Sequence, residues 1–132
     1  SGIFENKAGG RICVAGYYPW TFLENLSKSS QIKSIFRWLS KDSLPGYLDS
    51  FHRINLWIRE PRNGKIALTL TNSSFDPAAD VVLMLRTNSR NIKVYDMKCR
   101  ETIIKSSGSD GPYQKFILPY INQWQMRLAI TD

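Results

Sequence analysis

The residues that could support catalysis are few, and their spacing matches none of the common catalytic arrangements. The single histidine, His52, lies between Phe51 and Arg53 with no Gly-x-Ser-x-Gly sequence to supply a nucleophile. Asp76, Asp80 and Asp96 occur where predicted strands end, so turn and capping roles account for them. The sequence therefore predicts a chain that is not an enzyme, with His52 in a structural role.

No pattern indicates a metal or a cofactor. Cys13 and Cys99 have neither a Cys-x-x-Cys partner nor a suitably spaced histidine. The glycine-containing stretch 108–111 precedes Pro112 and a predicted strand, whereas a phosphate-binding loop precedes a helix. We expect no metal site, no cofactor and two buried free thiols, with a Cys13–Cys99 disulfide left open.

Aromatic residues are the remaining candidates for ligand contact. Four of them fall within the six residues 17–22, interrupted by Pro19. Exposed rings in a sandwich can stack on sugars, and the candidate carbohydrate-stacking residues are Tyr18, Trp20, Trp57 and Tyr120. The favoured interpretation of residues 17–22 is a packed seam between domains, because aromatic residues commonly fill such junctions.

Composition limits the possible partners. The 132 residues are 42% hydrophobic and carry 18 Lys and Arg against 11 Asp and Glu, a net charge of +7. The basic residues are spread along the chain without a nucleic-acid-binding motif, so nucleic acid is an unlikely partner and an acidic neighbouring domain is an alternative. No apolar run approaches the roughly 20 residues of a membrane span.

One helix is expected in the first third of the chain. Ile32, Ile35, Phe36 and Leu39 have the spacing of an amphipathic helix, which we expect to begin at a cap formed by Ser29 or Ser30 and to end before 44–46. Residues 1–7 are expected to be loose. The glycine-bounded run 12–15 is typical of a strand buried on both faces of a parallel sheet, which suggests a truncated α/β domain.

The rest of the chain predicts β-structure. Alternating apolar residues on both sides of the turn-forming sequence 72–77 indicate a β-hairpin or a corner between two sheets. Trp124, Met126, Leu128 and Ile130 share one face of the last strand, and 106–112 is expected to be a loop. The predicted strands are 53–59, 65–71, 81–86, 91–96, 101–105, 113–118 and 124–130.

This spacing predicts the fold class and the domains. Short strands about ten residues apart favour a mainly β protein, an antiparallel β-sandwich of the immunoglobulin-like or Greek-key type, with one N-terminal amphipathic helix. Residues 1–46 are expected to contain a linker, an orphan strand and the helix, as the tail of an upstream α/β domain. Residues 47–132 are expected to form the sandwich.

Several segments resemble a known family. The sequence 9–17, Gly-Gly-Arg-Ile-Cys-Val-Ala-Gly-Tyr, is similar to the last strand of a glutamine-amidotransferase-like domain of β-galactosidase-type glycoside hydrolases, and the 31–45 helix fits that context. Segments 70–77, 81–86, 117–119 and 124–130 resemble the C-terminal β-sandwich that follows in these enzymes. The resemblance implies a non-catalytic accessory domain and a periplasmic or extracellular location, which nothing else in the sequence indicates.

These observations leave three functional hypotheses. The leading one is a structural accessory sandwich that packs against upstream domains of its parent chain. A carbohydrate-binding module that uses surface aromatics to hold a glycan is the second, and a basic nucleic-acid-binding surface is the third. A homodimer is also predicted, because an unpaired strand at 12–15 would seek a partner strand.

Overall fold

The computed structural model describes residues 2–18, 25–60 and 63–132. The chain forms two compact units, residues Ser1–Leu44 and Pro45–Asp132. The first contains β1 (Gly2–Glu5), β2 (Arg11–Val14) and α1 (Leu26–Leu39). The second contains β3 (Gly46–Leu48), β4 (Ile54–Arg59), β5 (Ala67–Asn72), β6 (Val81–Arg86), β7 (Asn91–Tyr95), β8 (Glu101–Lys105), β9 (Gly108–Asp110), β10 (Tyr113–Leu118) and β11 (Met126–Thr131).

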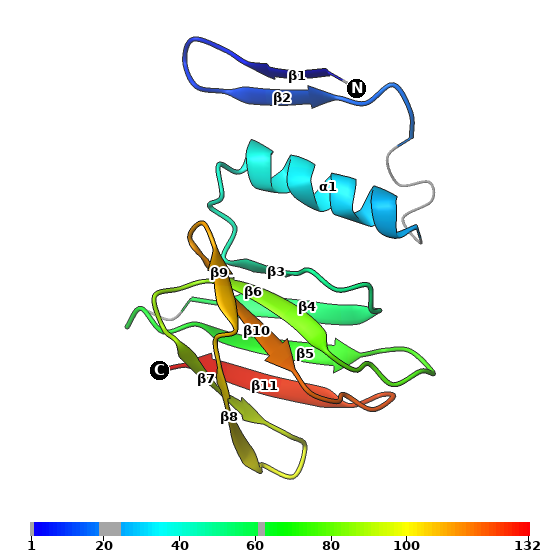
Figure 1. The fold of residues 1–132 in the computed structure, drawn as a ribbon, viewed down its shortest axis with the longest axis vertical. Helices are drawn as coiled ribbons and strands as arrows, with labels where there is room; N and C mark the ends of the chain where they lie inside the picture. Colours follow the sequence, from blue (N-terminus) through cyan, green and yellow to red (C-terminus); the bar gives the residue numbers. More distant parts are fainter. Residues whose placement is uncertain (1, 19–24, 61–62) are drawn as a thin grey trace. The chain divides into compact units, whose positions relative to one another are not determined.

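The second unit is a β-sandwich, as predicted. One sheet has the order β3-β6-β10-β9 and the other has the order β4-β5-β11-β7-β8. Every strand pair in both sheets is antiparallel. Figure 1 shows the strands of this unit and their connections. The mainly antiparallel β class is confirmed, as is a single helix among residues 2–18, 25–60 and 63–132, while the immunoglobulin-like type stays a prediction.

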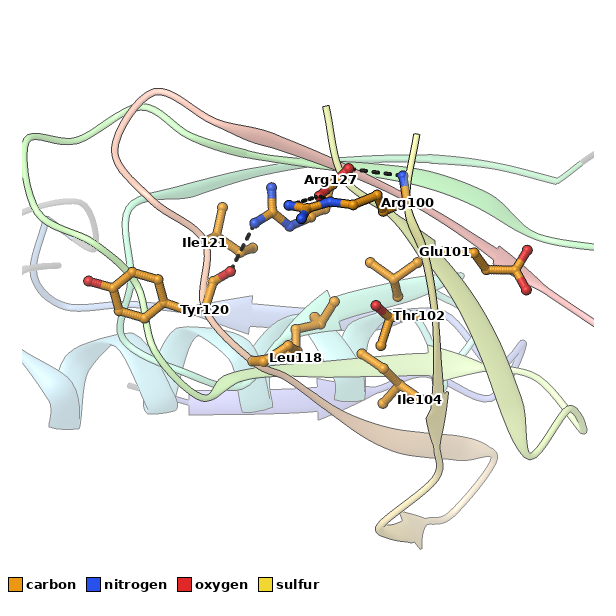
Figure 2. A pocket seen from close by; sticks show the side chains of 11 residues that line it. Arg100, Glu101, Thr102, Ile104, Leu118, Tyr120, Ile121 and Arg127 are labelled. Atoms are coloured by element: carbon orange, nitrogen blue, oxygen red, sulfur yellow. Dashed lines mark hydrogen bonds and ion pairs between the residues drawn. The ribbon is translucent and has the colours of Figure 1, made fainter. Parts of the chain in front are cut away.

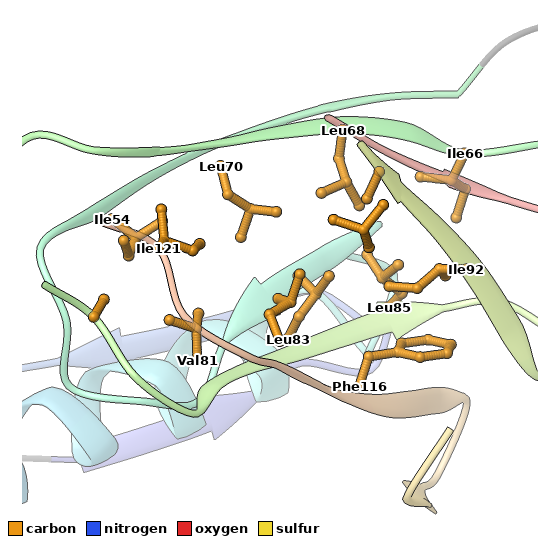
Figure 3. Packing of buried hydrophobic residues seen from close by; sticks show 14 residues of the cluster. Ile54, Ile66, Leu68, Leu70, Val81, Leu83, Leu85, Ile92, Phe116 and Ile121 are labelled. Atoms are coloured by element: carbon orange, nitrogen blue, oxygen red, sulfur yellow. The ribbon is translucent and has the colours of Figure 1, made fainter. Parts of the chain in front are cut away.

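The core lies between these two sheets. Leu68 and Leu70 of β5 point toward Leu83 of β6 and Phe116 of β10, as Figure 3 shows. These four side chains are at most 2% exposed, and the whole buried cluster is drawn from residues 54–129. The alternation that the sequence shows on either side of residues 72–77 therefore buries one face of β5 against one face of β6.

The segment between β5 and β6 is a corner between sheets. β5 pairs with β4 and β11, whereas β6 pairs with β3 and β10. The sequence left a hairpin and a corner open, and the structure selects the corner. Two facing apolar strands can bury against each other across the sandwich without pairing, because each finds its hydrogen-bond partners in its own sheet.

The first unit differs from its expected form. Residues 2–5 are not loose: they pair antiparallel with β2, and Asn6 Oδ1 accepts from the Gly10 N–H at 2.7 Å in the turn. β2 is thus neither an orphan strand nor part of a parallel sheet. Ile12 and Val14 are exposed rather than buried, because neither strand is covered on that face. Strand pairing with a second copy of the chain stays a prediction.

The helix begins earlier than expected. Asn25 is the N-cap, and its Oδ1 accepts from the Ser27 N–H at 2.9 Å, so Ser29 and Ser30 lie inside the first turns. At the other end Lys41 and Asp42 adopt left-handed conformations, with φ of 54° and 55°. The helix has no buried residue, although its apolar stripe is present.

Besides β1, two other strands were not predicted, and the apolar residues Met126 and Leu128 of β11 face outward. β9 lies within the expected loop 106–112, and β3 begins at Gly46, a residue that we expected to lie beyond the sandwich. Met126 and Leu128 are exposed, because Ala129 and Thr131 on the opposite face of β11 enter the core instead. Both missed strands are three residues long, too short for alternation to reveal them.

Gly46 tests the close approach that β3 makes to β6. A Cβ atom there would lie 2.7 Å from the Met84 carbonyl oxygen and 2.7 Å from Leu85 Cδ2. We expect Gly46→Ala to lower the free energy of unfolding by about 1–3 kcal/mol, as overpacking does elsewhere. Chemical denaturation measures this change. Gly16→Ala is the control, since nothing lies within 4 Å of its added Cβ, and equal effects of the two substitutions would contradict the assignment.

Candidate functional site

A buried asparagine organises one end of the sandwich. Asn72, the last residue of β5, is 1% exposed. Its Nδ2 donates to the Asp76 carbonyl oxygen at 2.8 Å and to the Ile121 carbonyl oxygen at 3.0 Å. Its Oδ1 accepts from the Ser74 N–H at 3.1 Å and from the Ser74 hydroxyl at 2.8 Å. One side chain therefore joins the β5–β6 corner to the β10–β11 connection.

Backbone hydrogen bonds strengthen the same junction. The N–H of Asn72 donates to the Gln125 carbonyl oxygen at 2.9 Å. Ala78 and Ile121 form an isolated antiparallel bridge with two N–H to carbonyl bonds of 2.9 Å. The two connections are thus fixed to each other at several points, and side chains on them are held in defined positions.

These connections present an aromatic pair to solvent. The rings of Phe75 and Trp124 meet edge-to-face, with centroids 5.5 Å apart and an interplanar angle of 81°. Phe75 is 83% exposed and Trp124 is 60% exposed. Figure 1 shows the β5–β6 and β10–β11 connections at the end of the sandwich opposite the C-terminus. We call these two residues the aromatic corner.

Trp124 has an unusual backbone conformation. Its φ is +55°, in the left-handed region that side chains other than those of Gly, Asn and Asp seldom occupy. Because the Trp124 side chain is 60% exposed, its burial contributes little free energy to offset this backbone strain. Backbone strain of this kind gathers at functional sites, where the surrounding structure enforces it.

A cleft lies beside the aromatic corner. The segments 51–53 and 73–78 line a space of about 540 Å³. Its walls include two phenyl rings, Phe51 and Phe75, together with the polar side chains of His52, Ser73 and Asp76. We call this space the loop-end cleft. It combines apolar walls with a few polar groups, as small-molecule sites do.

A second pocket opens between the two sheets. It has a volume of about 360 Å³. Figure 2 shows Thr102 and Ile104 of β8 on one side and Leu118 on the other, while the Glu101 carboxylate points away. Arg127 closes one side, and its Nη2 donates to the Tyr120 carbonyl oxygen at 3.1 Å. Acidic and basic side chains occur in equal number among the lining residues, so the pocket has no net charge to select an ion.

In the turn between β7 and β8, the carboxyl group of Asp96 has a lowered pKa. The Asp96 carboxylate accepts from the N–H groups of Arg100 at 3.0 Å and Lys98 at 2.8 Å, and it pairs with the Arg100 guanidinium at 2.7 Å. Because these hydrogen bonds, those from Arg100 first, favour the charged form, the pKa of Asp96 falls to about 2. This is the turn role predicted for Asp96.

A neighbouring hydrogen bond acts in the opposite direction. The Tyr95 hydroxyl donates to Glu101 Oε2 at 2.5 Å. This bond needs the protonated phenol, and it raises the pKa of Tyr95 above its ordinary value; partial burial and the negative charge of Glu101 act in the same direction. Tyr95 and Glu101 are paired residues of β7 and β8, so their hydrogen bond supports the pairing of these two strands.

Three of the four predicted carbohydrate-stacking residues lie in the described parts of the chain. Tyr18 belongs to the first unit, and Trp57 lies on the outer face of the five-stranded sheet, where it is 74% exposed. Tyr120 is half exposed beside the pocket between the sheets. Trp20 lies outside the described residues. Whether any of them contacts a sugar stays a prediction.

Sequence reasoning missed Phe75, and it placed Trp124 in a strand. A phenylalanine inside the turn-forming sequence Asn-Ser-Ser-Phe-Asp-Pro has no alternation to bury it, so exposure could have been expected. Nothing in the sequence indicates the left-handed conformation of Trp124, which ends the alternation before β11 begins at Met126.

The other candidate residues carry no catalytic arrangement in the described residues. His52 is exposed at the loop-end cleft. Cys13 is partly exposed and Cys99 exposed, both as free thiols, which corrects the expectation that they are buried. Asn72 begins an Asn-Ser-Ser sequence, which matches the pattern for N-glycosylation. Both hydrogens of its Nδ2 are already donated to backbone carbonyl oxygens inside the fold. Within residues 2–18, 25–60 and 63–132, no cluster of potential metal ligands is found.

Comparison with protein-family models, with curated proteins and with solved structures finds no match to this chain. Among the residues that the structure describes, no helix is long and apolar enough to cross a membrane. The function must therefore be argued from the geometry of this chain.

Asn72 offers a test of the junction. Asn72→Ala would remove four hydrogen bonds and leave the Ser74 N–H without its partner, while the Asp76 and Ile121 carbonyl oxygens would keep their bonds from the Ser74 hydroxyl and the Ala78 N–H. We expect a loss of about 1–3 kcal/mol in the free energy of unfolding, the cost of a polar group left unpaired. Chemical denaturation provides the measurement. Asn55→Ala is the control, because Asn55 is exposed and its side chain donates to Ser73 Oγ at the surface.

The β7–β8 turn gives a pH prediction. The pKa of Asp96 is lower in the folded chain than in the unfolded one, so its stabilising effect is present above about pH 4 and is lost as the pH falls through 2. We expect NMR titration of the Asp96 carboxyl to give a pKa near 2. In Arg100→Gln the pKa should rise but stay below 3.8, because the backbone N–H bonds persist. An unchanged pKa would exclude a contribution of the guanidinium.

Proposed function

We propose that the chain is a non-catalytic accessory module of a multidomain carbohydrate-active protein, in which the first unit packs against a neighbouring domain. One observation supports this proposal most directly. Among the described residues of the first unit none is buried, whereas the second unit has a closed core of its own. A unit without a core needs a partner to hold its structure.

The β1–β2 hairpin supplies the contact surface. Phe4 pairs with Ile12, and Gly2 pairs with Val14, so these side chains share one face. Phe4, Ile12 and Val14 are each more than half exposed. The opposite face is partly engaged, since Arg11 donates to the Trp38 carbonyl oxygen at 2.6 Å and stacks 4.9 Å from the Trp38 ring. We call Phe4, Ile12 and Val14 the hairpin face.

An isolated two-stranded hairpin is only marginally stable in water. Burying three apolar side chains would contribute several kcal/mol, at about 1.5–3 kcal/mol for each. The net charge of the first unit also indicates which charge the partner surface carries. Residues 1–44 contain six Lys and Arg and three Asp and Glu, so the complementary surface is apolar with an acidic rim.

Hydrogen–deuterium exchange tests the proposal. In the isolated 132-residue chain, we expect the amides of β1 and β2 to exchange fast and those of β5, β6 and β11 to be protected. In the native polypeptide that contains this chain, β1 and β2 should become protected as well. Phe4→Ser with Ile12→Thr should remove only that added protection, whereas Trp57→Ser on the outer sheet face is the matched control. Equal exchange of β1 and β2 in both contexts would exclude the proposal.

A further inference from the structure

The loop-end cleft and the aromatic corner adjoin each other through Phe75, and neither contains a residue of the hairpin face. The cleft is lined by residues 51–53 and 73–78, and Phe75 belongs both to its wall and to the ring pair with Trp124. All of these residues belong to the second unit, whereas the hairpin face belongs to the first. We propose that this site binds a neutral saccharide of one or two rings.

The aromatic corner suits the apolar side of a sugar ring. The C–H groups of a pyranose face carry a slight positive charge and pack against the negative face of an aromatic ring. Phe75 and Trp124 stand at 81° to each other, so a ring stacked on one meets the second at its side. This geometry favours the end of a glycan over a long flat chain, which would need coplanar rings in a row.

The polar groups suit hydroxyl groups. Asp76 offers a carboxylate acceptor and His52 a ring that can donate and accept. The Ser73 hydroxyl accepts from Asn55 Nδ2 at 2.8 Å, so its own O–H is directed to another acceptor. The lining also includes Arg53, so its one acidic side chain, Asp76, is balanced by a basic one, and a balanced lining beside two phenyl rings favours a neutral, polyhydroxylated ligand. A volume of about 540 Å³ is in the range of small-molecule sites and limits the ligand to a few rings at most.

The site is rigid before any ligand binds. The hydrogen bonds of Asn72 to Ser74 and to the Asp76 carbonyl oxygen fix the residues on both sides of Phe75. The left-handed conformation of Trp124 sets the direction of its side chain, and the edge-to-face contact with Phe75 restrains the indole ring. Preorganised rings lose little conformational entropy on binding, which favours recognition through a small contact area. The strain is then explained by ligand contact, because neither ring contributes to the core.

The experiment is an NMR titration of the 15N-labelled 132-residue chain, monitored at the Trp124 indole N–H. The probes are glucose, galactose, mannose, xylose, N-acetylglucosamine, lactose and cellobiose, with a polyproline peptide as the competing ligand class. We expect a saturable shift with at least one sugar, with a dissociation constant in the millimolar range. Phe75→Ala and Trp124→Gly should each weaken binding at least tenfold, the latter monitored at the amides of segments 73–78.

Controls separate binding from folding. Trp124→Gly should keep or raise the melting temperature, because glycine adopts positive φ without strain. Trp57→Ala removes an equally exposed tryptophan on the outer sheet face and should leave sugar affinity within twofold. The proposal is overturned if no sugar gives a saturable shift, if only polyproline does, or if Trp57→Ala weakens binding as much as Phe75→Ala. None of these outcomes depends on whether the hairpin face packs against a neighbouring domain.

Discussion

The four hydrogen bonds of the Asn72 side chain are the constraint on which one end of the sandwich depends. The β5–β6 corner leads the chain from one sheet into the other, and a corner of this kind leaves backbone groups without ladder partners. Asn72 satisfies those groups with one amide, and the same bonds hold the β10–β11 connection against the corner. A buried side chain with all its polar atoms paired gives rigidity that an exposed turn residue would not give.

The rigidity of this junction explains how exposed rings can be held in fixed positions. Phe75 lies between two residues bound to Asn72, and Trp124 precedes Gln125, whose carbonyl oxygen accepts from the Asn72 N–H. Core side chains are positioned by packing on all sides, but Phe75 and Trp124 are positioned by the backbone beneath them. The resulting corner faces solvent beside a cleft with mixed polar groups. A scaffold of this type places the residues that stabilise the fold between the sheets and leaves the loops to present side chains to solvent, where the proposed site lies.

The two units of the chain differ in how they bury apolar surface. In the sandwich, Leu70, Leu83 and Phe116 are fully enclosed by their own unit. In the first unit, the hairpin face is exposed. β2 and α1 are joined by a hydrogen bond from Arg11 to the Trp38 carbonyl oxygen and by a cation–π contact between the same two residues. Polar and cation–π contacts of this kind contribute about 1–2 kcal/mol each, less than a core does. The difference is the physical basis for assigning the first unit a packing role.

The sequence alone determined the β-sandwich, because alternation of period two in β4, β5, β6 and β7 states which side chains enter the core. It also indicated the helix from the spacing of Ile32 to Leu39, although not its cap at Asn25. Only the tertiary structure decided that 72–77 is a corner, since a turn-forming sequence allows hairpin and corner alike. The outward face of β11 and the positive φ of Trp124 were likewise beyond the sequence. The face of β11 that enters the core is set by its pairing with β5 and β7. The turn that contains Trp124 is held by the bond from the Asn72 N–H to the Gln125 carbonyl oxygen, a contact between residues distant in the chain. The candidate site shares this origin, because segments 73–78 and 119–125 are brought together by the pairing of β5 with β11, two strands that are distant in the chain.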